Sequence, residues 1–235
     1  MFNKVILAVV GTSKSGKTTA IEVLIKGLTK KGYKIGSAKH IPEVGFTIDS
    51  QGKDTWRHTQ AGASAVLSVS QKEVAIIRKI NTENWDLKRM VSEFPEDIDL
   101  IILEGFKKLV EQDSSIPKLI TAKTIEEVKS AFERYKNILS FIVLFPFPEI
   151  ETDIPFIDTL KEPEKLVNLV DQKVAILIKR KREREEKIIV NINGEILPLG
   201  DFVQDILRNT ILGMISSLKG VKIKGEEKVS VVIKD

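Results

Sequence analysis

The hydrophobic and polar positions at the start of the chain follow two successive patterns. Residues 5–10 are all apolar, which is typical of a parallel strand that is covered on both faces. After a turn that contains glycine, apolar residues recur at the i, i+3, i+4 and i+7 positions of a helix: Ile21, Leu24, Ile25 and Leu28. The pattern predicts a buried strand, a turn and an amphipathic helix.

Later segments continue this alternation of strands and helices. Apolar runs predict strands over residues 33–38, 65–69, 74–78, 98–104 and 139–145. Helical patterns lie around Trp56 and over residues 87–90, 125–135 and 163–178. Strands that alternate with helices indicate an α/β fold, in which a mostly parallel sheet is flanked by helices.

The character of the sequence changes after residue 178. Residues 179–187 form a charge run of mixed sign with no aromatic residue, which favours a solvated linker over a nucleic-acid-binding patch. The next segment predicts a hairpin around Asn193-Gly194, an amphipathic helix over residues 203–218 and a closing pair of strands over residues 221–233. We therefore predict a nucleotide-binding domain over residues 1–178, a linker over 179–187 and a small α+β domain over 188–235.

Composition excludes several classes of protein. The chain has no cysteine, so disulfides, thiolate nucleophiles and cysteine-based metal sites are absent. A net charge of +4 suits a small anionic ligand and gives little support for nucleic-acid binding. No segment approaches the roughly 20 apolar residues of a membrane helix, and the amino terminus lacks a signal-peptide pattern. We expect a cytoplasmic protein that binds neither membranes nor nucleic acid.

Residues 11–18 match the phosphate-loop pattern G-x-x-x-x-G-K-[ST] at every constrained position, between the predicted strand and helix. Gly11 and Gly16 allow successive N–H groups to point at one phosphate group. Lys17 is expected to reach the β- and γ-phosphates, and the Thr18 hydroxyl is expected to bind Mg²⁺. The chain is thus predicted to be a P-loop NTPase. The expected nucleotide-binding residues are Gly11, Thr12, Ser13, Lys14, Ser15, Gly16, Lys17, Thr18 and Thr19.

An acidic residue is expected on the metal side of such a loop. Glu104 is the best candidate, because it follows four apolar residues and so emerges at the carboxyl edge of the sheet, while Gly105 leaves room for a phosphate. A polar segment over residues 39–58 would suit a switch-like loop around Mg²⁺ and phosphates. The guanine-reading N-K-x-D tetrapeptide is missing, so spacing does not choose between ATP and GTP.

The combined motifs resemble the molybdopterin-guanine dinucleotide biosynthesis protein B (MobB) family over about residues 5–170. Besides the phosphate loop, they are K-H at 39–40, Asp49, G-K-D-T-W-R-H at 52–58, A-G-A at 61–63, L-E-G-F-K at 103–107 and P-K at 117–118. The resemblance implies a Mg²⁺-GTP-binding adapter with weak GTPase activity. Such a protein would form a homodimer and assist the nucleotidyltransferase that joins GMP to molybdopterin.

The resemblance also implies roles for individual residues. Asp49 and Glu104 would be the carboxylates on the Mg²⁺ side. The residues expected on the phosphate or pterin side are Lys39, His40, Lys53, Asp54, Arg57 and Gly105. Residues 41–46 stand where family members often carry a further histidine, and the family pattern does not explain the segment from Lys187 onward.

A second function stays open at this point. A P-loop kinase or ATPase that acts on its own small-molecule substrate would also need the phosphate loop and a cationic loop. A kinase lid is typically rich in arginine, whereas the lid-like stretch over residues 107–115 contains none. The sequence identifies no dedicated nucleophile or catalytic base.

Overall fold

The computed structural model describes residues 4–143, 151–185, 188, 190–192, 195–197 and 199–219. The chain divides into two compact units, Met1–Val174 and Ala175–Asp235. Helix α6 (Pro163–Glu185) passes through this boundary without a break, so residues 179–185 of the predicted linker are helical. Among the described residues, no helix combines the length and hydropathy that are needed to cross a membrane.

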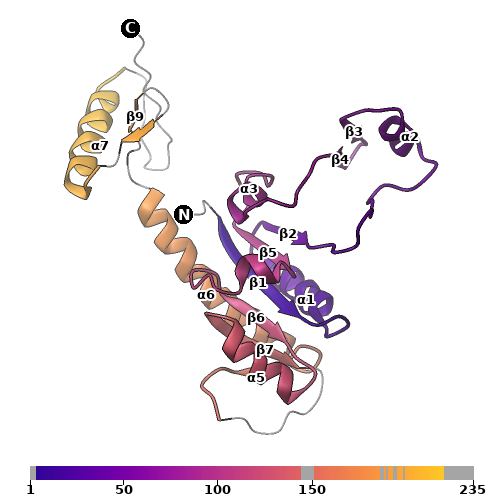
Figure 1. Cartoon of the computed structure of the whole chain (residues 1–235). Helices are drawn as coiled ribbons and strands as arrows, with labels where there is room; N and C mark the ends of the chain where they lie inside the picture. Colours follow the sequence, from indigo (N-terminus) through magenta and orange to yellow (C-terminus); the bar gives the residue numbers. More distant parts are fainter. Residues whose placement is uncertain are drawn as a thin grey trace. The chain divides into compact units, whose positions relative to one another are not determined.

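A six-stranded parallel sheet forms the centre of the first unit, in the order β2-β5-β1-β6-β7-β8 (Figure 1). Its strands are β1 (Val5–Gly11), β2 (Ile35–Lys39), β5 (Leu100–Glu104), β6 (Lys118–Thr121), β7 (Ile138–Val143) and β8 (Phe156–Asp158). The predicted α/β class with a mostly parallel sheet is confirmed. Strands β6 and β8 were not predicted, because β6 begins on a lysine and β8 has only three residues.

Helices cover both faces of this sheet. Apolar residues of α3 (Leu87–Val91), α4 (Lys107–Val110) and α5 (Ile125–Arg134) join alternate residues of β1 in one buried core cluster. Alternation along β1 turns Leu7 and Val9 toward the other face, where α1 (Lys17–Lys30) and the first part of α6, up to Val174, lie (Figure 1). All six residues of the run 5–10 are buried, as the unbroken apolar pattern predicted.

Strands β3 (Ala65–Val69) and β4 (Val74–Arg78) lie at the predicted positions but form a separate antiparallel pair. The four residues between them explain this arrangement, because parallel pairing needs a crossover of a dozen or more residues. Ser70 N donates to Glu73 O at 2.8 Å and closes the hairpin. The short helix α2 (Asp54–Gln60) precedes this hairpin.

The second unit contains a hairpin and a helix. Strand β9 (Val190–Ile192) pairs antiparallel with β10 (Glu195–Leu197), and α7 (Asp201–Ser216) follows. These elements lie where the sequence predicts them. The Asn193-Gly194 turn and the closing strands predicted over residues 221–233 lie outside the described residues.

Candidate functional site

The loop between β1 and α1 requires glycine at both ends of its motif. A Cβ atom on Gly11 would lie 2.0 Å from Thr121 Oγ1 and 2.4 Å from Thr121 O. Gly16 has a φ of 89° and is the N-cap of α1, a left-handed conformation that favours glycine. The two glycines therefore fix a curled main chain that opens directly onto a helix N-terminus.

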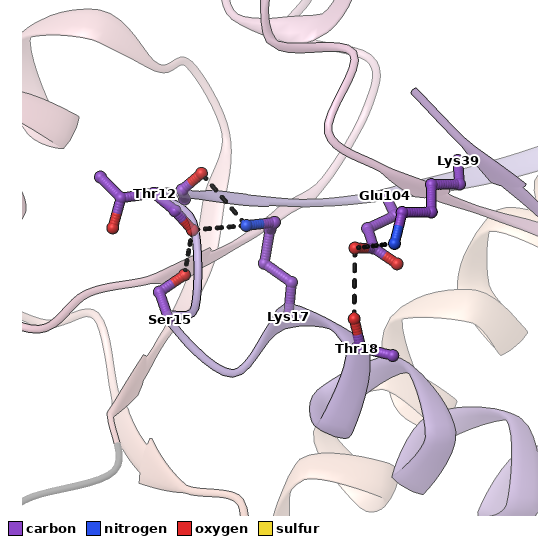
Figure 2. A network of polar contacts seen from close by, with 7 residues as sticks. Thr12, Ser15, Lys17, Thr18, Lys39 and Glu104 are labelled. Atoms are coloured by element: carbon purple, nitrogen blue, oxygen red, sulfur yellow. Dashed lines mark hydrogen bonds and ion pairs between the residues drawn. The ribbon is translucent and has the colours of Figure 1, made fainter. Parts of the chain in front are cut away.

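Two buried hydroxyl groups hold this loop, and Figure 2 shows the first of them, Ser15, against Thr12. Ser15 Oγ donates to Thr12 O at 2.8 Å and lies 2.5 Å from Thr121 Oγ1. The Thr121 hydroxyl in turn lies 3.2 Å from the carbonyl oxygen of Val10. Both hydroxyl side chains are almost fully buried. The end of β6 thus holds the loop in its curled shape.

Lys17 lies over the loop with its ammonium group on main-chain oxygens, as Figure 2 shows. Its Nζ donates to Thr12 O at 2.5 Å and to Gly11 O at 3.4 Å. Burial lowers the pKa of Lys17. The negative charge of Glu104 raises this pKa, whereas the positive charges of three lysines lower it further: Lys107, Lys39 and Lys123. Three further cationic side chains therefore lie near Lys17, an arrangement that attracts a polyanion.

Glu104 lies beside this loop at the carboxyl end of β5. Its Oε1 accepts a hydrogen bond from Thr18 Oγ1 at 3.3 Å and lies 3.5 Å from Lys39 Nζ. The pairing register explains the meeting, because Lys39 of β2 and Val9 of β1 are both direct partners of Glu104. Thr18 and Glu104, two of the three predicted Mg²⁺ ligands, are thus in contact.

Asp49, the third predicted Mg²⁺ ligand, makes only local hydrogen bonds among the described residues. Its Oδ1 accepts from Ser50 N at 2.9 Å and from Thr55 Oγ1 at 2.8 Å, while its buried Oδ2 has no partner there. The described part of the chain contains no group of three or more histidine or acidic side chains suited to a metal. Asp49 orders the approach to α2 in this structure.

The remaining predicted residues fall into two groups. His40 lies at the site. Its main-chain N–H donates to Glu104 O at 3.0 Å, and its ring packs edge-on against that of Phe106, with 5.4 Å between the ring centroids. Gly105 has a φ of 87° and turns the chain after β5. Asp54 and Arg57 instead belong to α2, where they pair at 3.7 Å with both side chains exposed, and Lys53 is the residue just before this helix.

Two residues that the sequence analysis missed also contact the loop, Lys123 just before α5 and Glu127 in its first turn. Glu127 Oε1 accepts from Thr12 Oγ1 at 2.9 Å, and Lys123 Nζ donates to Ser13 O at 3.2 Å. Glu127 Oε2 also accepts from Lys123 N at 2.7 Å. The capping pattern Thr124-x-x-Glu127 marks a helix start and was the available signal. It carries no information about contact with the loop.

A cavity of about 290 Å³ lies on the α5 side of the loop. Its walls include Gly11, Thr12, Lys107, Glu127, Ser130 and Tyr135. Burial raises the pKa of Tyr135. The cavity provides space for a second group beside whatever the loop binds.

The P-K pair at 117–118 has a structural explanation. Lys118 is fully buried, and its Nζ donates to Asp113 O at 2.6 Å and to Ile116 O at 2.8 Å. Burial lowers the pKa of Lys118 to about 8. The lysine anchors the start of β6, the strand that carries Thr121.

The strand order, the curled loop and the flanking helices define a protein with the P-loop NTPase fold. A crystal structure of molybdopterin-guanine biosynthesis protein B (MobB) superposes with a TM-score of 0.56 at 26% identity, over 73% of this chain and 99% of that one. The structure of Bacillus subtilis MobB gives the same TM-score at 24% identity, over 70% of this chain and 96% of that one.

Sequence relatives lead to the same family. A Haemophilus influenzae molybdopterin-guanine dinucleotide biosynthesis adapter protein is 29% identical over 160 residues, 68% of this chain and 84% of the relative. A Methanocaldococcus jannaschii relative is 28% identical over 230 residues, 92% of each chain, so its similarity extends beyond the first unit. Residues 6–143 match the family model of MobB, molybdopterin guanine dinucleotide synthesis protein B. The chain belongs to the MobB family.

Proposed function

We propose that this chain is an adapter of molybdopterin guanine dinucleotide biosynthesis that binds Mg²⁺-GTP on residues 11–19. The carrying observation is the convergence of Lys17, Thr18 and Glu104 at a loop whose main chain is already curled. The adapter role is supported by the names of the Haemophilus influenzae and Escherichia coli relatives, both called molybdopterin-guanine dinucleotide biosynthesis adapter proteins.

The loop supplies main-chain N–H groups to the phosphates, and the N-terminus of α1 adds its partial positive charge. Lys17 exchanges the oxygens of Thr12 and Gly11 for the β- and γ-phosphates when the nucleotide binds. This exchange is favourable because a charge-assisted contact with a phosphate replaces contacts with neutral carbonyl groups.

Thr18 and Glu104 are the residues that would hold Mg²⁺. A hydroxyl and a carboxylate oxygen 3.3 Å apart suit an ion that takes few protein ligands and completes its octahedron with phosphate oxygens and water. The ion would neutralise charge on the β- and γ-phosphates. Asp49 would join this pair only after the segment before α2 moves, since the described residues bring no third acidic or histidine side chain to a metal-binding group.

Hydrolysis is expected to be weak at most. Glu127, the carboxylate on the α5 side of the loop, already accepts hydrogen bonds on both of its oxygens, and Glu104 faces Thr18 and Lys39. Both carboxylates are thus already engaged by neighbouring groups. Presentation of the nucleotide to the nucleotidyltransferase suits this arrangement better than turnover does.

A homodimer is also part of the proposal. Hairpin β3–β4 is not part of the main sheet. It exposes four large apolar side chains: Leu67, Val69, Val74 and Ile76. Exposed apolar strands are a surface that a second copy of the chain could cover.

Calorimetry of GTP and ATP in the presence of Mg²⁺ tests the proposal. We expect GTP to bind with a clear preference, and we expect the protein to copurify with the nucleotidyltransferase. The cavity beside the loop favours one alternative, a kinase or ATPase with its own small substrate. A preference for ATP, together with phosphorylation of a small acceptor, would replace the adapter proposal with that alternative.

A further inference from the structure

The carboxylate of Glu104 already has a cation beside it. Lys39 Nζ lies 3.5 Å from Glu104 Oε1, the same oxygen that accepts the hydrogen bond from Thr18 (Figure 2). The Glu104 side chain is only 14% exposed, whereas that of Lys39 is 61% exposed. The ammonium group therefore lies on the solvent side of a mostly buried carboxylate, at the atom that the proposed metal site needs.

The pairing of β2 with β5 fixes this meeting. Lys39 and Glu104 are direct partners in the register of the two strands, so both side chains leave the same edge of the sheet. The main-chain N–H of His40, the next residue, also donates to Glu104 O at 3.0 Å. Only the long, exposed stem of Lys39 is free to swing away from this position.

Two cations cannot share one carboxylate oxygen without strong repulsion. Lys39 also adds to the positive charge around Lys17, since it is one of the three lysines that lower the Lys17 pKa. A polyphosphate would relieve this crowding by giving Lys39 a new partner. The lysine of this pair is largely exposed and the two atoms lie 3.5 Å apart, so the pair is weak enough to be exchanged in this way.

We propose that Lys39 competes with the divalent cation for Glu104. The Lys39 ammonium group pairs with Glu104 while the loop is empty, and it moves to the phosphates when the nucleotide binds together with its metal ion. This inference rests on the proposed nucleotide site. It implies that Glu104 accepts a divalent cation tightly only together with the nucleotide. The protein would thus select the metal–nucleotide complex over free metal.

Mn²⁺ is the probe for the test, with the free ion measured by electron paramagnetic resonance. We expect Lys39→Gln to bind Mn²⁺ about fivefold more tightly than the unmodified chain when no nucleotide is present, since the competing ammonium group is removed from Glu104. We expect the same variant to bind Mn²⁺-GTP several-fold more weakly, because the phosphates lose a partner. The expected result is thus a higher affinity for free Mn²⁺ together with a lower affinity for Mn²⁺-GTP. Lys39→Arg, which keeps the positive charge, should restore both affinities.

Lys34→Gln is the matched control. Lys34 lies just before β2, is 63% exposed and pairs with Asp97 at 2.7 Å, so the variant removes the same charge at the opposite end of the strand. Both of its affinities should stay within about twofold of the original values, because solvent screens the distant charge.

The outcomes separate the two proposals. An unchanged, weaker or undetectable affinity of Lys39→Gln for free Mn²⁺ overturns the competitor role, even when GTP binds normally. Tight Mn²⁺ binding by Glu104→Gln would instead remove Glu104 from the metal site. Failure of the unmodified chain to bind GTP would contradict the proposed function itself.

Discussion

The phosphate loop and the segment around α2 both carry predicted site residues, and the fold holds them in different ways. The buried hydroxyl groups of Ser15 and Thr121 hold the loop in place. The ammonium group of Lys17 also donates to a carbonyl oxygen of the loop. Helix α2 has no buried residue along its described length, and its ion pair between Asp54 and Arg57 is exposed. The phosphate loop, whose proposed contacts with phosphate come from its main chain, thus already has its curled shape in the free protein. The exposed side chains around α2 would become buried only when a ligand or partner binds them.

Alanine at glycine positions in the two regions should show the largest difference. Gly11→Ala places a Cβ atom 2.0 Å from Thr121 Oγ1 and 2.4 Å from a main-chain oxygen, so we expect a loss of about 3 kcal/mol in the free energy of unfolding. Gly52→Ala, near α2, meets nothing within 4 Å but has a φ of 87°, so it should cost about 1 kcal/mol. Urea unfolding of both variants measures the difference. Equal losses would show that the loop is not tightly packed.

The buried lysine under the loop should give a smaller effect that depends on pH. The pKa of Lys118 is about 8 in the folded chain and near its ordinary value of 10.5 when unfolded, so the unfolded state binds more protons between these values. The contribution of Lys118 to stability therefore rises as pH increases through this window. Between pH 7.5 and 9.5 we expect the unmodified chain to gain about 2 kcal/mol relative to Lys118→Met.

Lys53→Met, at an exposed position before α2, is the control for this measurement. Its unfolding free energy should follow the same pH profile as that of the unmodified chain. If Lys118→Met also kept that profile, the ammonium group of Lys118 would not be buried in solution.

The parts of the fold that were predictable from sequence are those with a local cause. The run over residues 5–10 and the glycines of the loop specify a strand and a turn through burial and backbone conformation. Glu104 followed from the four apolar residues before it. The pairing of β3 with β4 was missed, because periodicity predicts a strand without naming its partner.

The missed part of the site depends on distant contacts. Glu127 lies 115 positions from Thr12 in the sequence, and Lys123 lies 110 positions from Ser13. Strand β6, which brings α5 to the loop, begins with a lysine that becomes buried only because two carbonyl oxygens accept its hydrogen bonds. No pattern along the sequence encodes such a pairing.

Calorimetric titration of Mg²⁺-GTP into Lys17→Ala and Lys34→Ala tests the central claim most directly. Lys17 lies over the curled loop and should contribute a charge-assisted contact with the phosphates, so its removal should weaken binding by about 100-fold or more. Lys34→Ala, which removes an equal charge at an exposed position just before β2, should change the affinity by no more than about twofold. Normal GTP binding by Lys17→Ala would contradict the account and place the nucleotide elsewhere on the protein.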